Sequence, residues 1–258
     1  MSAPRRSSCA PSRPPVSSAR SAWAAAGPPS LRRPPPTPRR LGAALGGALP
    51  APGQRIGLLG GSFNPAHGGH RTISEEALRR LDLDAVWWLV SPQNPLKPRA
   101  GMAPQPERVA SARRVVGDAP HIRVTTLEQA LGTLYTLDTL NAVTRRMPGM
   151  HFVWLMGADN LLQIHRWAHW HRIFERVPVA VFNRPNYFFA VQSAKAAHRF
   201  RRARLPERKA ARLAITPPPA WVFLHEPRDP RSATAIRARQ REGQTVRSWS
   251  RRCTPSPS

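Results

Sequence analysis

Short apolar runs alternate with amphipathic segments along the middle of the chain. Apolar runs of this length are typical of strands that are buried on both faces of a parallel sheet. The predicted strands lie at 56–59, Asp84–Ser91, His121–Thr125, His151–Met156, Val177–Phe182 and Trp221–Leu224. The segments between them have the spacing of helices, and these lie at Thr72–Leu81, Pro106–Val116, Thr136–Arg146, Asn160–Arg166, His169–Arg176 and Ala233–Arg241.

Strands that alternate with helices favour right-handed βαβ units in an α/β fold with a doubly wound parallel sheet. We expect a single domain over residues 55–241. In such a sheet, ligands bind beyond the carboxyl ends of the strands.

The two ends of the chain differ from this pattern. Residues 1–54 carry eight arginines, no acidic residue and many Pro, Ser and Ala. A segment with so little large apolar surface does not offset the entropy lost on ordering. We therefore expect 1–54 to be a disordered Arg/Pro-rich extension and 242–258 to be a disordered tail.

The segment after Arg39-Arg40 reads LGAALGGALPAPG, which has some features of a twin-arginine export signal, and the acid-free Arg-rich stretch also has features of a transit peptide. The favoured interpretation is a GC-rich reading frame translated upstream of its true start. Both cysteines, Cys9 and Cys253, lie in the ends, which fits a reducing compartment. No apolar run approaches the roughly 18 residues of a membrane span, and we expect a cytoplasmic protein without membrane contact.

The formal net charge of +26 raises the question of nucleic-acid binding. Nearly half of it lies in residues 1–54 and 239–258, and part of the remainder lies in the basic run at 195–212. This run has few interleaved aromatic residues, so we interpret it as a solvated helical face. No specific nucleic-acid partner is expected, because a polyanionic small substrate also requires a positive field.

The first apolar run leads into residues 56–70, which read IGLLGGSFNPAHGGH. Without a Cβ, Gly60 and Gly61 allow a tight turn whose N–H groups approach an anion closely. His67 and His70 are three residues apart, so a helix that starts between them places both on its positively charged end. The pattern predicts a phosphate-binding turn. A zinc site would need three or four ligands, and no Cys or acidic residue adjoins this pair.

A second candidate phosphate site follows the last predicted strand. Ser232 can cap the next helix, Thr234 offers a hydroxyl and an N–H in its first turn, and Arg237 offers a planar fork to phosphate oxygens. Alone, this pattern is commonly a capped helix with a surface arginine. Its position about 160 residues after the HGGH turn favours the phosphate role.

These two motifs resemble the (H/T)xGH and SxTxIR signatures of the nucleotidylyltransferase superfamily. More narrowly, residues 55–238 are similar to bacterial nicotinate-nucleotide adenylyltransferases. The resemblance implies a Rossmann-like fold and a set of site residues. It assigns catalysis to His67, His70, Lys97 and Arg237, and ATP binding to Gly61, Ser62, Phe63, Gly157, Asp159, Ser232 and Thr234.

Motifs between the two signatures support the narrower family. Gly157 and Asp159 follow the fourth predicted strand, and Trp167 comes eight residues after Asp159. The resemblance implies that Asp159 contacts ATP near the ribose and that Trp167 stacks on the pyridine ring, as a flat indole can. Ordinary core packing is the alternative for Trp167.

The segment LYTLDTL at 134–140 resembles the family's SYTxDTL, with Leu134 in place of Ser, and implies that Thr136 binds the nicotinate. PQNPLK at 92–97 resembles the substrate loop, which places Asn94 near the nicotinate and Lys97 near the phosphates. Asn64 stands where many relatives have Asp.

The implied reaction is adenylyl transfer from ATP to nicotinate mononucleotide, giving nicotinate adenine dinucleotide and pyrophosphate. Catalysis then consists of positioning and charge stabilisation. Mg²⁺ would be held by the phosphates, and no metal site made of protein groups is predicted. Pantetheine-phosphate adenylyltransferase is the alternative within the superfamily, and a basic nucleic-acid-binding protein is the alternative of a different class. The sequence leaves open the true start and whether the chain forms a homo-oligomer.

Overall fold

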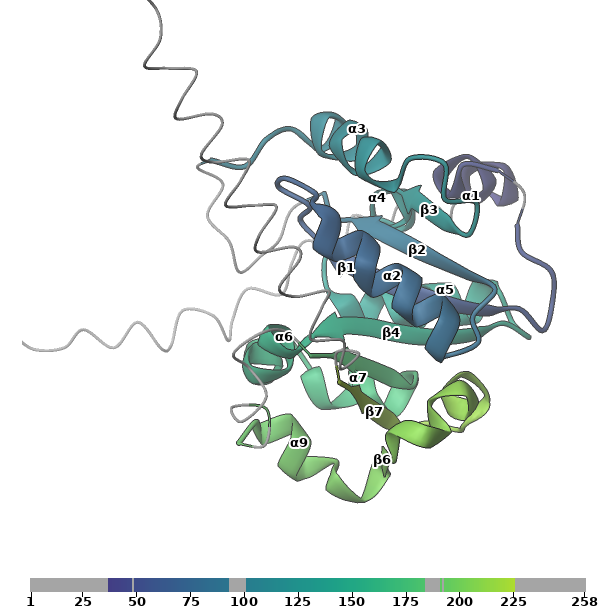
Figure 1. Ribbon diagram of the computed structural model, residues 1–258. Coiled ribbons are helices and arrows are strands. Elements are labelled where there is room, and N and C mark those ends of the chain that lie inside the picture. Colours follow the sequence, from purple (N-terminus) through teal and green to yellow (C-terminus); the bar gives the residue numbers. More distant parts are fainter. Residues whose placement is uncertain (1–36, 48, 93–100, 184–190, 192, 226–258) are drawn as a thin grey trace, which may run out of the picture. The chain divides into compact units, whose positions relative to one another are not determined.

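The computed structural model describes residues 37–47, 49–92, 101–183, 191 and 193–225 (Figure 1). The chain divides into two units, Met1–Pro34 and Pro35–Ser258, and every described residue lies in the second. The predicted helix at 233–241 and the tail at 242–258 lie outside the described residues. None of the described helices is long and apolar enough to cross a membrane.

The second unit is built on one sheet of seven parallel strands, in the order β3-β2-β1-β4-β5-β7-β6. This confirms the predicted doubly wound parallel sheet. The bounds are β1 Arg55–Gly61, β2 Ala85–Val90, β3 Ile122–Thr125, β4 His151–Gly157, β5 Val179–Phe182, β6 Arg204–Leu205 and β7 Trp221–Leu224. The central strands are buried on both faces because their apolar residues alternate between two core clusters.

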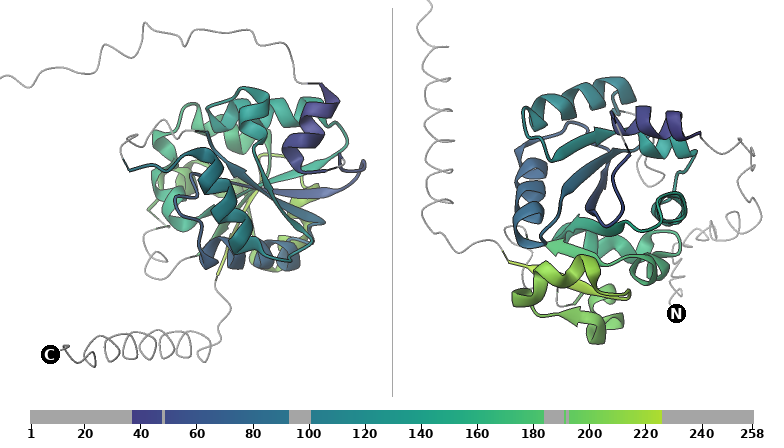
Figure 2. Two further views of the ribbon diagram at one scale, coloured as in Figure 1. Left: turned by 90° about the horizontal axis from the view of Figure 1, so that it is seen from above. Right: turned by 90° about the vertical axis from the view of Figure 1, so that its right-hand side faces the viewer.

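Helices cover both faces of the sheet (Figures 1 and 2). One face packs against α2 Gly68–Arg80, α3 Gln105–Val116 and the 3₁₀ segment η3 Glu207–Ile215. The other face packs against α1 Pro38–Leu45, α4 Leu127–Leu131, α5 Thr136–Arg146, α6 Ala158–Gln163, η1 Ile164–Arg166, α7 Trp170–Arg176 and α9 Lys195–Arg199. A short 3₁₀ turn, η2 Arg201–Ala203, leads into the edge strand β6.

Within segment 1–54, for which we expect disorder, the described residues include helix α1. Thr37 caps α1, Pro38 stands in its first turn, and Gly46 ends it in the left-handed conformation. Leu41 and Leu45 are four residues apart, lie on one face of the helix and are buried in the core. Composition averaged over 54 residues conceals this one amphipathic stretch.

The basic run at 195–212 does not form the single helical face that we expected. It forms α9, η2, the two-residue strand β6 and part of η3. The strand extends the sheet by pairing Arg204 and Leu205 with Trp221 and Val222 of β7. The side chains of Arg199, Arg201, Arg202, Arg208 and Arg212 are exposed, so the run is solvated as expected.

Candidate active site

The strand order reverses next to β1, because the chain runs from β1 through β2 to β3 and then returns to β4 on the other side of β1. Leu59 pairs with Leu155, so Gly61 at the end of β1 and Gly157 at the end of β4 lie at the same edge. A reversal of this kind opens a crevice at the carboxyl ends of the strands, where ligands bind in open α/β sheets. Two of the sequence motifs therefore meet there.

The turn after β1 differs from the one that we predicted from its glycines. Gly60 and Gly61 both belong to the strand, and neither has a positive φ. Gly60 is instead required by packing, since a Cβ there would lie 2.4 Å from Cη2 of Trp154. The chain turns at Phe63, whose φ is +47°. The Phe63 side chain is buried, so it can offer a nucleotide only its backbone.

His67 and His70 lie together at the start of α2. His67 caps the helix, and the centroids of the two rings are 4.0 Å apart. Nδ1 of His70 lies 3.3 Å from both the backbone nitrogen and the carbonyl oxygen of His67, so it accepts from the first or donates to the second according to its tautomer. The first N–H groups of a helix and its dipole favour an anion at this point. The pair is thus suited to phosphate oxygens.

Buried groups beneath the turn fix His70 in place. Its ring lies 4.8 Å from that of Phe63 and 5.7 Å from that of Trp88, measured between centroids. Phe63 and Trp88 stack at 5.0 Å. The Trp88 indole N–H donates to Oγ of Ser74 at 2.8 Å, and Ser74 donates to the carbonyl of His70 at 2.9 Å. This support explains how an exposed motif obtains a defined geometry.

On the other side of the switch point, Gly157 ends β4 and Asp159 lies in the first turn of α6. Trp167 follows η1 and is half-buried against the core. Its ring meets Trp154 edge-on, with centroids 6.5 Å apart. Because Trp154 also fills the space above Gly60, it connects the strand before the HGGH turn with the indole predicted to stack on the pyridine.

Thr136 is the first residue of α5, whose amino end faces the same edge of the sheet. Behind it lies a polar pair that the sequence did not single out. The Glu128 side chain accepts a hydrogen bond from Oγ1 of Thr139 at 3.5 Å, and both side chains are buried. Burial raises the pKa of Glu128 to about 7, although the bond from Thr139 acts in the opposite direction.

Five predicted site residues lie outside the described residues, namely Asn94, Lys97, Ser232, Thr234 and Arg237. The sequence also missed Arg108, which is buried on α3 and bonds to the carbonyl of Ser62. A signal was present, since Arg108 shares the inward face of α3 with Ala112 and Val116.

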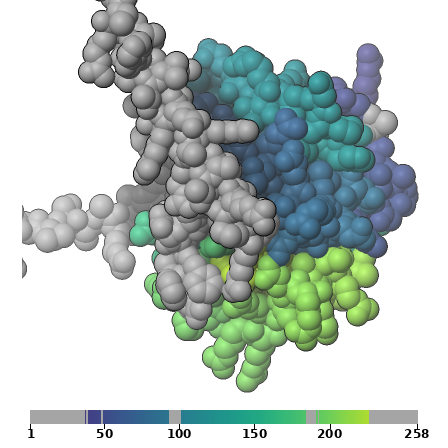
Figure 3. Space-filling view, in the orientation of Figure 1, coloured from purple at the N-terminus to yellow at the C-terminus, as the bar shows by residue number. Residues whose placement is uncertain are grey.

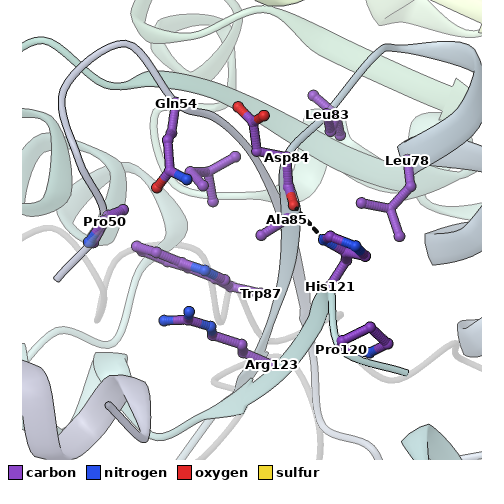
Figure 4. A pocket seen from close by; sticks show the side chains of 11 residues that line it. Pro50, Gln54, Leu78, Leu83, Asp84, Ala85, Trp87, Pro120, His121 and Arg123 are labelled. Carbon is purple, nitrogen blue, oxygen red and sulfur yellow. Dashed lines mark hydrogen bonds between the residues drawn. The ribbon is translucent and has the colours of Figure 1, made fainter. Parts of the chain in front are cut away.

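The cavity that the described residues form most clearly lies elsewhere (Figure 4). It has a volume of about 490 Å³ and is lined by Gln54, Asp84, Trp87, His121 and Arg123, among others. These residues stand at or just before the starts of β1, β2 and β3, which is the edge opposite the switch point. A ring nitrogen of His121 bonds to the carbonyl of Asp84 at 3.0 Å. This cavity contains none of the predicted site residues.

Comparison with known proteins places the chain in a family. A family model described as cytidylyltransferase-like matches residues 58–239. The chain is 55% identical over 185 residues to a probable nicotinate-nucleotide adenylyltransferase of Methylorubrum extorquens, which covers 72% of this chain and 100% of that protein. It is 51% identical over 191 residues to a protein of the same name from Parvibaculum lavamentivorans, covering 74% of this chain and 94% of the relative.

The chain belongs to the nicotinate-nucleotide adenylyltransferase family.

A solved member of this group from Plasmodium falciparum shares the fold. The structure of its nicotinic acid mononucleotide adenylyltransferase complexed with NaAD matches with a TM-score of 0.51 and 14% identity, over 68% of this chain and 77% of that chain. Within the nicotinate-nucleotide adenylyltransferase fold, the HGGH turn and the Gly157–Asp159 segment both lie at the β1/β4 switch point. The exposed arginines of the run at 195–212 belong to the green segments of Figure 3.

Proposed function

We propose that this chain transfers the adenylyl group of ATP to nicotinate mononucleotide, giving nicotinate adenine dinucleotide and pyrophosphate. The observation that carries the proposal is the His67/His70 pair at the switch point of a chain that matches a probable nicotinate-nucleotide adenylyltransferase over that relative's whole length. A cytoplasmic site of action follows from the supply of ATP there.

In the proposed reaction, a phosphate oxygen of the mononucleotide attacks the α-phosphorus of ATP, and the bond to the β,γ-pyrophosphate breaks. No covalent enzyme intermediate is needed. His67 and His70 bind the triphosphate, with His70 nearest the α-phosphate, where an N–H donor stabilises the charge that develops on the equatorial oxygens. We assign Lys97 and Arg237 to the departing pyrophosphate.

The two nucleosides are assigned to the segments on either side of the switch point. Asp159 accepts hydrogen bonds from the ribose of ATP, while the backbones of Gly61, Ser62 and Phe63 approach its phosphates. Thr136 and Trp167, with Asn94, form the nicotinate site. The amino end of α5, which begins at Thr136, favours a carboxylate over a neutral amide, because the first N–H groups of a helix lie at its positive end.

The described side chains offer Mg²⁺ no set of protein ligands, since no three His, Cys, Asp or Glu residues among them lie close together. The nearest groups of the HGGH turn are imidazoles, which are poor ligands for this ion compared with oxygen. Mg²⁺ bound to the substrate phosphates would neutralise part of their charge. The protein residues then have only to orient the phosphates.

A rate assay with the full chain, ATP and each candidate acceptor tests the proposal. We expect pyrophosphate release with nicotinate mononucleotide, and a much lower kcat/KM with nicotinamide mononucleotide. Equal values for the two would contradict the assigned carboxylate preference. Release with phosphopantetheine alone would favour the alternative within the superfamily. No release with any acceptor, together with tight salt-sensitive RNA or DNA binding, would favour the nucleic-acid alternative.

A further inference from the structure

Arg108 is an ionised side chain that lies in the core with 2% of its surface exposed. Its Nε donates to the carbonyl of Ala103 at 2.9 Å. Nη1 donates to the carbonyls of Ser62 at 2.6 Å and Ser91 at 2.9 Å, and Nη2 donates to that of Pro92 at 3.0 Å. Four of the five N–H groups are thus used, all on backbone oxygens.

Among the described residues, no carboxylate pairs with Arg108. Burial lowers its pKa from the usual value, although an arginine remains charged at neutral pH. A buried cation without a counter-ion is costly unless its hydrogen bonds are satisfied. An apolar residue here would leave four backbone carbonyls without this donor, so the connections that the side chain makes are the informative feature.

Those connections join three separate points of the backbone. Ser62 precedes the turn that carries the two histidines, Ser91 and Pro92 follow β2, and Ala103 stands on the far side of residues 93–100. One guanidinium therefore fixes both ends of that segment against the phosphate-binding turn.

Asn64 makes a second connection of the same kind. Its Nδ2 donates to the carbonyl of Gly101 at 3.0 Å, and its Oδ1 accepts from the N–H of Ala103 at 3.2 Å. An amide both donates and accepts, whereas a carboxylate at this position could only accept. The side chain of Gln105 adds a bond of 2.8 Å to the carbonyl of Val90, which holds the start of α3 to the end of β2.

We propose that Arg108 and Asn64 are positioning residues that hold the turn bearing His67 and His70 in register with the chain on either side of residues 93–100. The inference rests on the proposed function, in which ATP binds at that turn and the mononucleotide must be aligned with it. Neither residue touches the reacting atoms. Loss of either side chain moves the two substrates out of the alignment needed for in-line attack. A misplacement of about 1 Å costs on the order of 100-fold in rate.

The proposal predicts different changes in the KM values of the two substrates. The HGGH turn is also held from beneath by Phe63, Trp88 and Ser74, so the KM for ATP changes little. The KM for the mononucleotide rises and kcat falls, because the chain on either side of residues 93–100 is no longer held against the HGGH turn. A residue with only a structural role would lower the folded fraction, which reduces apparent kcat and leaves both KM values unchanged.

The test uses the full chain with Asn64→Asp, Asn64→Ala, Arg108→Lys and Arg108→Met. Arg113→Gln is the matched control, since Arg113 is exposed on the same helix. Initial rates are measured with both substrates varied, and melting temperatures are recorded for every variant. We expect Asn64→Ala and Asn64→Asp to lower kcat/KM for the mononucleotide by about 10-fold or more, with the KM for ATP within about twofold.

Arg108→Lys retains the charge but lacks the planar fork, so it should retain more activity than Arg108→Met. If Arg108→Met does not fold, the Asn64 variants still test the proposal, because the Asn64 side chain is exposed and its replacement leaves the core intact. An active wild type together with unchanged kcat/KM in both Asn64 variants would overturn the inference. An equal loss for both substrates that follows the melting temperature would also overturn it. A wild type that forms no dinucleotide would instead overturn the proposed function, and this inference with it.

Discussion

Gly60 lies against the indole of Trp154 so closely that a Cβ at position 60 would stand 2.4 Å from Cη2. Cβ atoms in folded proteins essentially never approach another atom so closely, and the obstacle is a large buried ring in the adjacent strand. The pair therefore sets the spacing of β1 and β4 at the switch point. The Trp154 ring also supports Trp167, whose own ring meets it edge-on.

Replacing Gly60 by Ala should destabilise the protein by about 1–3 kcal/mol, because the core must move to accept the methyl group. Displacement of Trp154 should also disturb Trp167 and raise the KM for the mononucleotide. Gly68→Ala is the control for stability, since a Cβ there meets nothing within 4 Å. Chemical denaturation of both variants measures the difference. Equal free energies of unfolding would show that the core adapts without cost.

Replacing His70 by Ala should lower kcat by about 100- to 1000-fold, as removal of one donor to a transition-state oxyanion does elsewhere. The fold should persist, because Phe63 still stacks on Trp88 without the imidazole. His198→Ala, on the exposed side of α9, controls for loss of an imidazole as such. Steady-state rates and melting temperatures measure both effects. Near-normal turnover in the His70 variant would remove it from the catalytic assignment.

The sheet could be predicted from the sequence because parallel strands buried on both faces are almost continuously apolar, as in Ala85–Val90. The short edge strand β6 was not predicted, since Arg204 and Leu205 have no strand pattern and pair only because β7 is adjacent. Helix α4 spans five residues, too few for a helical period to be recognised.

The same distinction applies to the site. His67 and His70 could be predicted because both are carried by one short motif whose geometry is local. Arg108 and Asn64 act on carbonyl and N–H groups that are distant in sequence, and backbone groups leave no signature in the residue types. The buried state of Glu128 likewise depends on how α4 packs, not on its neighbours in the chain.

Glu128 should make stability depend on pH. Its side chain is 6% exposed, and burial raises the pKa to about 7 from an ordinary value of 4.5. Between these values the folded protein binds one proton more than the unfolded chain, so the free energy of unfolding falls as pH rises through that window. The expected total change is about 3 kcal/mol.

Glu128→Gln should remove this dependence, because the amide stays neutral and can still accept the bond from Thr139. Relative to wild type, the variant should be more stable at pH 8 and of similar stability at pH 5. Denaturant unfolding at several pH values measures the slope. Glu107→Gln, an exposed substitution on α3, serves as the control. Parallel slopes for wild type and Glu128→Gln would mean that Glu128 is ionised in the folded state without cost.

The packing of α1 underlies the last prediction, which concerns removal of residues 1–54. Leu45 is 1% exposed, and α1 contributes a backbone bond of 3.3 Å from the N–H of Thr126 to the carbonyl of Ala44. Thr126 precedes α4, which carries Glu128. Loss of α1 would expose apolar surface on α4 and on the adjacent face of the sheet.

A chain that begins at Gln54 should therefore melt several degrees lower than the full chain, and Leu45→Ala should cost about 2–5 kcal/mol. Leu49→Ala is the matched control, because Leu49 is 43% exposed and should change stability by less than about 0.5 kcal/mol. Comparing the truncation with Leu45→Ala separates the packing of one helix from the loss of basic charge, since only the truncation removes arginines. If both leave the melting temperature unchanged, α1 does not pack on the sheet in solution, and composition alone would have described this segment correctly.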